Sequence, residues 1–332
     1  MIDEISLISE ISSLFEGGKG SNVSLGIGDD CAAIVIDSNS EMVITTDTIT
    51  EGVHFNHKWT RMVDVGYKSV VVSVSDVAAM GGSAKHILLS INGPPTLTKS
   101  HIRQYLKGFK QACDKYEVTL IGGNYSNSPA DLSFTMTVLG EITKCSRIER
   151  KGASPEDIIY ITGAPGESAL GLSILNSRKN KLTAAERRLI NRHKRPTPRL
   201  EWGKLLANNN LVSAMIDVSD GIALDLKRLT DASHVSALIH LNHFPLSRDT
   251  VKSFDCMGNR LWRLILTGGE DYELLFTANK KNSMKIEKLI KSGLIEAAAI
   301  GKIIPKGPDP KFFLTSGKEL KMHQYGWLHN NK

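Results

Sequence analysis

Two runs of alternating strand and helix patterns, divided by one charged turn, constrain this chain more than any other feature. In the first run, residues 41–48, 85–92 and 132–141 are β-branched or alternate apolar and polar residues, as half-buried strands do. Residues 99–116 have the apolar spacing of an amphipathic helix. Residues 63–80 are ambiguous, because their valines favour a strand while their length and small residues favour a buried helix.

The charged turn at residues 145–155 contains glycine and proline and leads into a new predicted strand. We therefore place a domain boundary there, between residues 1–148 and 149–332. The second run contains a helix after Gly166, a basic helix over 183–195, a turn at 196–198, a helix over 199–208 and a strand at 214–221. At about 150 residues per domain, the length of 332 residues fits two domains, each an α+β or α/β layer structure.

Composition excludes several classes of protein. The four cysteines, Cys31, Cys113, Cys145 and Cys256, are far apart and form no C-x-x-C pair, so neither a zinc knuckle nor a disulfide framework is expected. The first ten residues are acidic, unlike a signal peptide, and no uncharged apolar run reaches the ~18 residues of a membrane helix. These features predict a soluble, cytoplasmic protein without a membrane partner.

The chain has a net charge of +6, and its basic residues concentrate between Lys144 and Lys204. A basic patch of this kind can bind nucleic acid. However, aromatic residues make up only 6 % of the chain, and the basic residues follow a helical pattern typical of a solvated face. We therefore expect no nucleic-acid partner.

Acidic residues recur beside glycine at the ends of predicted strands in five places. They are Asp29 and Asp30, Asp47, Asp76, Asp217 and Asp220, and Glu270 and Asp271. If several of these carboxylates converge, their repulsion requires cations between them. Oxygen ligands without histidine or cysteine favour Mg²⁺, which takes further ligands from substrate phosphates.

Each of these residues also has a simpler interpretation. Gly-Asp pairs are common in turns, Thr45 and Thr46 suit a strand, and a single histidine such as His54 is more often a packed or surface residue. The chain has no Walker A loop, no G-x-G-x-x-G after a strand and no G-x-S-x-G elbow. The remaining hypothesis is a metal-rich site that binds phosphates.

Eight segments, in order over about 300 residues, resemble the thiamine-monophosphate kinase family, which belongs to the aminoimidazole ribonucleotide synthetase superfamily. The segments are LGIGDDCA (25–32), TTDTITEGVHF (45–55), SVSDVAAMGG (73–82), IGGN (121–124), RKGASPEDIIYITGAPGESALGL (150–172), RPTPRL (195–200), IDVSDGIALDL (216–226) and LTGGEDYELLF (266–276). The resemblance implies an α+β fold, with an N-terminal domain that binds metal and ATP and dimerises through its sheet. A C-terminal α/β domain would carry substrate-contacting loops.

The resemblance also implies transfer of the γ-phosphoryl group of ATP to thiamine monophosphate, which yields thiamine diphosphate and ADP in the thiamine biosynthesis pathway. By matching positions, the Mg²⁺ ligands would be Asp30, Thr45, Thr46, Asp47, Asp76, Asn124, Asp217 and Asp220. The ATP contacts would be Tyr105, Gly123, Asn124, Arg150 and Ser219, and the thiamine contacts His54, Glu270 and Trp327. Arg150 would stabilise the transferring group. No general base is expected, because the accepting phosphate oxygen is already ionised.

Two departures from the family pattern keep alternatives open. Asn124 and Asn127 stand where many members have aspartate and arginine, so one metal position loses a charge. The ending GWLHNN is also unusual, and Trp327 could instead anchor the C-terminal tail. The alternatives are an ATP-using enzyme of the same superfamily with another acceptor, and a catalytically silent nucleotide-binding scaffold.

Overall fold

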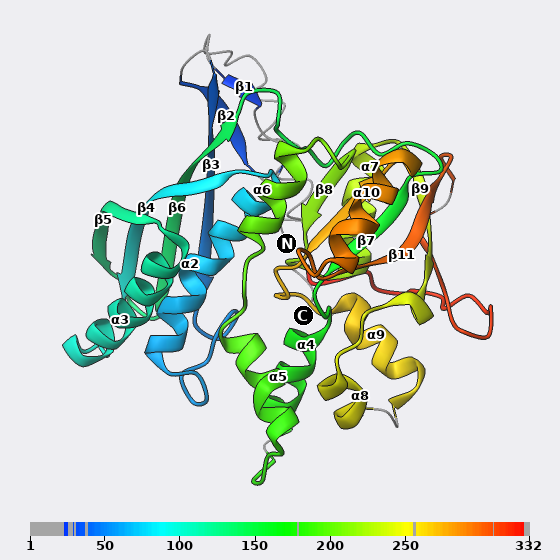
Figure 1. Ribbon diagram of the computed structural model, residues 1–332. Coiled ribbons are helices and arrows are strands. Elements are labelled where there is room, and N and C mark those ends of the chain that lie inside the picture. Colours follow the sequence, from blue (N-terminus) through cyan, green and yellow to red (C-terminus); the bar gives the residue numbers. More distant parts are fainter. Residues whose placement is uncertain are drawn as a thin grey trace.

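The computed structural model describes residues 23–25, 29, 31–36, 39–177, 179–254, 257–307 and 309–328, which form two six-stranded sheets with helices (Figure 1). The predicted two-domain fold of mixed α and β structure is confirmed. The predictions for the first ten residues, Asp30 and Cys256 lie outside the described residues. Among those described, Cys113 and Cys145 are free thiols. None of the described helices combines the length and apolar composition needed to cross a membrane.

The N-terminal sheet has the strand order β1-β2-β3-β6-β4-β5, and its neighbours are antiparallel except for β4 and β5. The strands are β1 (Val23–Leu25), β2 (Ala32–Val35), β3 (Ser40–Thr50), β4 (Ser83–Gly93), β5 (Thr119–Asn127) and β6 (Ser133–Thr143). The central strands alternate buried and more exposed residues, so one face of the sheet forms a core. The other face carries threonine pairs between β3 and β6, with Thr46 beside Thr137 and Thr48 beside Thr135.

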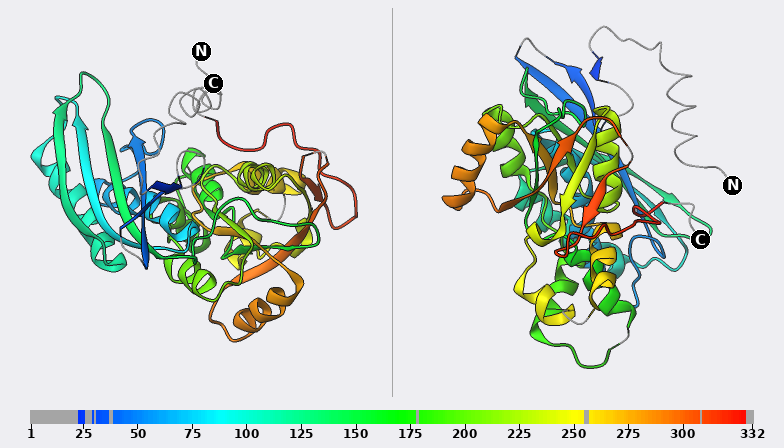
Figure 2. Two further views of the ribbon diagram at one scale, coloured as in Figure 1. Left: turned by 90° about the horizontal axis from the view of Figure 1, so that it is seen from above. Right: turned by 90° about the vertical axis from the view of Figure 1, so that its right-hand side faces the viewer.

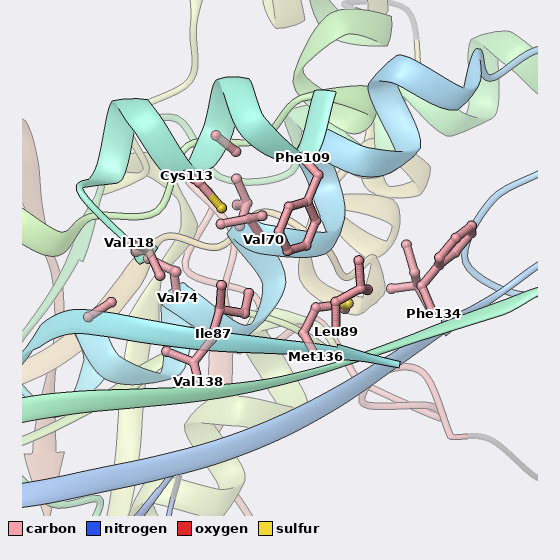
Figure 3. Close-up of a cluster of buried hydrophobic side chains, with 14 of the residues drawn as sticks. Val70, Val74, Ile87, Leu89, Phe109, Cys113, Val118, Phe134, Met136 and Val138 are labelled. Carbon is pink, nitrogen blue, oxygen red and sulfur yellow. The ribbon is translucent and has the colours of Figure 1, made fainter. Parts of the chain in front are cut away.

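Helices α2 (Met62–Ala79) and α3 (Lys99–Tyr116) cover the buried face of this sheet. Figure 3 shows Val70 and Val74 of α2 and Phe109 of α3 above Ile87 and Met136 of the sheet. The two helices cross closely at glycine. A Cβ atom on Gly108 would lie 1.7 Å from the carbonyl oxygen of Val63, so a larger residue cannot fit there without separating the helices.

The ambiguous segment 63–80 is therefore a helix. Helix α2 lies between the N-terminal sheet on one side and α6 and β8 on the other, and nearly all of its residues are buried (Figure 1). Its valines pack in the first core, while Ala78 and Ala79 at its end belong to a second core with residues of the C-terminal half. Burial on almost every side explains why no simple amphipathic pattern marks this helix.

The C-terminal sheet has the order β12-β9-β11-β7-β10-β8. The strands are β7 (Ile158–Thr162), β8 (Ala214–Asp217), β9 (Ser236–His240), β10 (Leu274–Ala278), β11 (Ala297–Ile304) and β12 (Lys311–Phe313). All neighbours are antiparallel except β12 and β9. The central strands are buried on both faces: Tyr160 and Phe276 face one core and Ile161 and Leu275 the other.

Helices cover both faces of this sheet. They are α4 (Glu167–Asn176), α5 (Ala184–Lys194), α6 (Leu200–Asn208), α7 (Ile222–Ala232), the short 3₁₀ helix η1 (Leu241–His243), α8 (Arg248–Phe254), α9 (Asn259–Thr267) and α10 (Lys280–Lys291). Helices α6 and α10 share a core with Tyr160 and Phe276, whereas α4, α7 and α9 share the other. Figures 1 and 2 show α4, α5, α8 and α9 grouped at one end of this half.

The predicted elements correspond well to the observed ones, with one systematic error. The helix predicted over residues 99–116 is α3, and the basic helix predicted over 183–195 is α5. The prediction that the acidic residues follow strand ends is wrong for two of them. Asp47 lies inside β3 and Asp76 lies in the last turn of α2. The geometry of the site therefore depends on how β3 and α2 pack, rather than on loops alone.

Candidate active site

The acidic residues of β3 and α2 meet across the N-terminal core. Thr45 and Asp47 alternate with the outward-facing residues of β3, so their side chains lie on the face that α2 covers. The hydroxyl of Thr45 donates a hydrogen bond of 2.5 Å to Oδ2 of Asp76 on α2. The packing of α2 on the sheet thus brings Thr45 and Asp76 together, on the face of β3 that also carries Asp47.

Thr46 does not join this cluster through its side chain. Because successive side chains of a strand point to opposite faces, Thr46 lies on the open face. Its hydroxyl donates to the carbonyl oxygen of Met136 at 3.1 Å and lies 3.2 Å from the hydroxyl of Thr137. The hydroxyl of Thr46 therefore points away from Thr45 and Asp47, and the role of Thr46 as a metal ligand stays a prediction.

A second contact joins the two halves of the protein. Ser75, next to Asp76 on α2, donates a hydrogen bond of 2.7 Å to Oδ2 of Asp217, the last residue of β8. Both residues are buried. The carboxylates of Asp76 and Asp217 are therefore held on either side of the junction between the N-terminal core and the C-terminal sheet.

The loop after β8 is organised by one buried carboxylate that sequence reasoning missed. Oδ2 of Asp225 accepts hydrogen bonds from the backbone N–H groups of Ser219, Asp220 and Gly221, at 3.1, 3.1 and 3.2 Å. Arg228, one turn further along α7, donates to Asp225 at 2.8 Å and to Asp220 at 2.6 Å. Burial raises the pKa of Asp225 to about 7, while Arg228 acts in the opposite direction.

The predicted carboxylates converge around one phenol. Burial, together with the charges of Glu270, Asp47, Asp217 and Asp220, raises the pKa of Tyr272 well above its ordinary value. The charges that act on the Tyr272 hydroxyl thus come from three separate segments of the chain. Residues of β3, of the loop after β8 and of the loop before β10 thus meet at the junction of the two halves.

The donor set of this cluster fits Mg²⁺. It consists of carboxylates and hydroxyls, which are the hard oxygen ligands that Mg²⁺ prefers, and contains no thiolate. Asp30 would add another carboxylate but lies outside the described residues. Among the residues that the structure does describe, no three His, Cys, Asp or Glu side chains already stand at metal-binding separation.

The predicted thiamine contacts lie beside this cluster. Glu270 precedes β10, and its carboxylate lies 2.5 Å from the Nζ atom of Lys68 on α2 and 3.4 Å from Nδ1 of His193 on α5. His54 is close enough to act on the pKa of Glu270, and its backbone oxygen accepts a hydrogen bond of 3.3 Å from Lys68. The backbone N–H of Trp327 donates to the carbonyl oxygen of Asp220 at 2.9 Å, and its side chain is half-exposed.

Sequence analysis did not identify Lys68 and His193 as site residues, because the patterns of the surrounding residues suggested other roles. Lys68 lies in the valine-rich segment that was ambiguous, and His193 lies in the helix interpreted as a solvated basic face. A signal was present in each case. Lysine inside an apolar helix needs a buried partner, and His193 follows Leu189 and Ile190 on the apolar side of α5.

The predicted ATP contacts lie in three different places. Arg150 donates from its backbone N–H to Asp29 at 3.3 Å and acts on the pKa of Asp225, so it lies near the loop that contains Ser219. Tyr105 is completely buried in the N-terminal core, where its ring stacks on Phe134 with centroids 3.8 Å apart. This position gives Tyr105 a packing role and leaves none of its surface open to a ligand.

Gly123 and Asn124 belong to β5, the edge strand of the N-terminal sheet, and both are exposed. Strands β6 and β4 separate β5 from β3. At ~4.8 Å per strand, the separation between β5 and β3 is ~14 Å. Within one chain, the amide of Asn124 therefore does not lie close to Asp47 on β3.

Comparison with known proteins defines the class first. The profile of the AIR synthase related protein N-terminal domain matches residues 28–142, and the profile of the corresponding C-terminal domain matches residues 154–309. The chain is thus an AIR-synthase-related protein in both of its domains.

Relatives define the family more closely. Thiamine-monophosphate kinase of Buchnera aphidicola from Schizaphis graminum is 40% identical over 286 residues, which are 86% of each chain. The enzyme of Bacillus subtilis is 33% identical over 330 residues, 99% of each chain. The solved structure of AaThiL complexed with AMPPCP and TMP matches with a TM-score of 0.85 and 32% identity, and covers 98% of this chain and 97% of that chain. The chain belongs to the thiamine-monophosphate kinase family.

Proposed function

We propose that this protein transfers the γ-phosphoryl group of ATP directly to the phosphate of thiamine monophosphate. The products are thiamine diphosphate and ADP, and the process is thiamine diphosphate biosynthesis in the cytoplasm. Relatives that span nearly the whole chain carry the name of this kinase, and AaThiL binds AMPPCP, an ATP analogue, together with TMP. The observation that carries the proposal is that α2 joins carboxylates of both halves, since Asp76 accepts a hydrogen bond from Thr45 of β3 and Ser75 donates one to Asp217 of β8.

The reaction joins two strongly anionic molecules, and the carboxylates alone would repel both. Mg²⁺, when bound, neutralises phosphate charge and aligns the reacting groups. The residues that would hold it are Asp30, Thr45, Asp47, Asp76, Asp217 and Asp220. Thr45 and Ser75 orient Asp76 and Asp217 by hydrogen bonds, so these two carboxylates are positioned before any ligand binds.

No side chain needs to act as a general base in this reaction. The attacking atom is a phosphate oxygen of thiamine monophosphate, and it is ionised at neutral pH. The remaining task for the protein is to hold the two phosphates in line and to stabilise the charge that is transferred. We assign that stabilising role to Arg150, which lies near the loop of Ser219, and the nucleotide contact to the same region.

Glu270, His54 and Trp327 form the thiamine side of the proposed site. Thiamine carries a cationic thiazolium and an aminopyrimidine that donates hydrogen bonds, and a carboxylate suits both. Glu270 is mostly buried but retains some exposed surface, so it can meet a ligand. The half-exposed indole of Trp327 can stack on either ring, because cations and aromatic rings attract each other.

A homodimer would explain how Gly123 and Asn124 could contact ATP although they lie far from β3 of their own chain. Both residues lie on an exposed edge strand, ~14 Å from β3 of the same chain. The neighbouring Leu120, Ile121 and Tyr125 of β5 are exposed apolar side chains. We propose that a second copy covers this strand, that residues 1–148 form the metal-binding, ATP-binding and dimerising domain, and that residues 149–332 form the C-terminal domain.

The test is an assay of thiamine diphosphate formation with purified protein, ATP, Mg²⁺ and thiamine monophosphate. We expect thiamine diphosphate and ADP in equal amounts. Asp47→Asn and Asp220→Asn should lower turnover ~100-fold or more, a typical loss when a charge-stabilising group is removed. Asp231→Asn, which changes an exposed carboxylate of α7, is the control. Consumption of ATP without thiamine diphosphate would show another acceptor, and nucleotide binding without turnover would show a silent scaffold.

A further inference from the structure

Lys68 is a buried ammonium group at the junction of the two halves. Its side chain is 2% exposed, and it projects from α2 toward the loop before β10. Its Nζ atom lies 2.5 Å from Oε1 of Glu270 and donates to the carbonyl oxygen of His54 at 3.3 Å. A buried charge without a partner costs several kcal/mol, so the folded protein keeps Lys68 and Glu270 as an ion pair.

Glu270 is fixed from several directions. Its backbone adopts the left-handed region with φ of +67°, and its N–H donates to the carbonyl oxygen of Ser219 at 2.7 Å. His193 lies 3.4 Å from Oε2, and Nδ1 of His193 lies 3.1 Å from the hydroxyl of Ser168. The backbone and the side chain of Glu270 are thus both held in place.

Lys68 supplies the positive charge that balances Glu270. Burial and the charge of Lys68 lower the pKa of His193 to about 4, so this histidine is neutral at neutral pH. Burial opposes ionisation of Glu270, but the charge of Lys68, joined by those of His193 and His54 when these are protonated, outweighs it and holds the pKa of Glu270 below its ordinary value. These three groups come from α2, α5 and the loop after β3, and Tyr272 lies two residues away on the same loop.

We propose that Lys68 is a positioning residue for substrate recognition: its ammonium holds one oxygen of Glu270 and presents the carboxylate, ionised, to the cationic rings of the acceptor. This inference rests on the proposed function, in which Glu270 contacts thiamine. Lys68 is too deeply buried to touch the acceptor itself, whereas the side chain of Glu270 is 22% exposed. The α2 helix thereby couples the N-terminal core to acceptor binding in the C-terminal half.

The experiment compares steady-state kinetics of the full-length wild type and Lys68→Met between pH 6 and pH 8.5, with thiamine monophosphate varied at saturating ATP. We expect Lys68→Met to raise KM for thiamine monophosphate ~10-fold or more while kcat changes less. Without the ammonium, burial raises the pKa of Glu270. The ratio of the variant KM to the wild-type KM should therefore grow as the pH falls.

Two further variants distinguish positioning from general support of the fold. Lys68→Arg keeps the charge and should restore most of the affinity. In a Glu270→Gln background, Lys68→Met should change KM and kcat less than twofold, because the group on which Lys68 acts has already been neutralised. This comparison removes both buried charges together, so it decides the matter even if Lys68→Met alone fails to fold. Lys110→Met, on the exposed side of α3, is the control.

The two proposals fail in different ways. A wild-type protein that forms no thiamine diphosphate would overturn the proposed function. An active wild type with an unchanged KM and pH profile in folded Lys68→Met would overturn only the role of Lys68. A further 10-fold loss on adding Lys68→Met to Glu270→Gln would also overturn it, because Lys68 would then act on something other than Glu270.

Discussion

Replacement of Asp225 by alanine should unfold the loop that carries Ser219 and Asp220. The Asp225 carboxylate has no exposed surface and accepts three backbone N–H groups and one guanidinium hydrogen bond. Loss of the acceptor from a buried donor costs ~1.5 kcal/mol, so the three N–H groups together account for ~4.5 kcal/mol. Total stability of a folded domain is ~5–15 kcal/mol, so this single substitution removes a large part of it.

The measurement is urea unfolding followed by tryptophan fluorescence, together with the thiamine diphosphate assay. Asp225→Asn keeps an oxygen acceptor but loses the charge that faces Arg228, and we expect about half the loss, ~2 kcal/mol. Asp231→Asn, on the exposed side of the same helix, should leave the unfolding free energy unchanged within ~0.5 kcal/mol. An Asp225→Ala protein with the unfolding midpoint and activity of the wild type would refute the reasoning, because the N–H groups would then have other partners.

Two further predictions concern burial. The pKa of His193 falls to about 4 in the folded protein from an ordinary 6.5. The unfolded chain therefore binds a proton at His193 more readily than the folded protein does. The free energy of unfolding keeps its full value above pH 6.5 and decreases by up to ~3 kcal/mol as the pH falls toward 4. His193→Gln should flatten the dependence of the urea unfolding free energy on pH in that range, and exposed His243→Gln should leave it unchanged. Equal dependence on pH in the two variants would contradict the role given to His193. Gly108→Ala places a methyl group against the backbone of Val63 and should cost ~3 kcal/mol, whereas Lys107→Ala on the exposed side of α3 should cost little. A melting temperature of Gly108→Ala equal to that of Lys107→Ala would show that the helices can separate without cost.

Local patterns predicted the elements that depend on nearby residues. The amphipathic spacing of α3 and its N-terminal cap residue Thr98 are contained in the sequence, and so is the alternation of β6. The α2 segment was ambiguous because it is buried on nearly all sides, and burial of that kind removes the periodicity that distinguishes a helix from a strand.

The sequence likewise predicted some features of the candidate site and not others. The gathering of Asp47, Asp217 and Glu270 followed from the repeated occurrence of acidic residues and from the resemblance to a family. The partners of those residues could not be predicted, because Lys68 and Glu270 are two hundred residues apart and meet only through the packing of α2 against the C-terminal half. The direction of the Thr46 side chain could not be predicted, because a run of polar residues does not reveal which of them a strand turns toward its helix.

The shared position of α2 has a consequence for how this protein can be divided. Its first turns complete the N-terminal core, and Ala78 and Ala79 of its last turn belong to one core with Leu206 and Phe276 of the other half. A gene fragment that ends near residue 148 would leave the last turn of this helix without its apolar contacts, and the complementary fragment would expose the surface that the turn had covered. Neither fragment should remain monodisperse when expressed alone, and co-expression of both is the condition under which a split form of this enzyme would assemble.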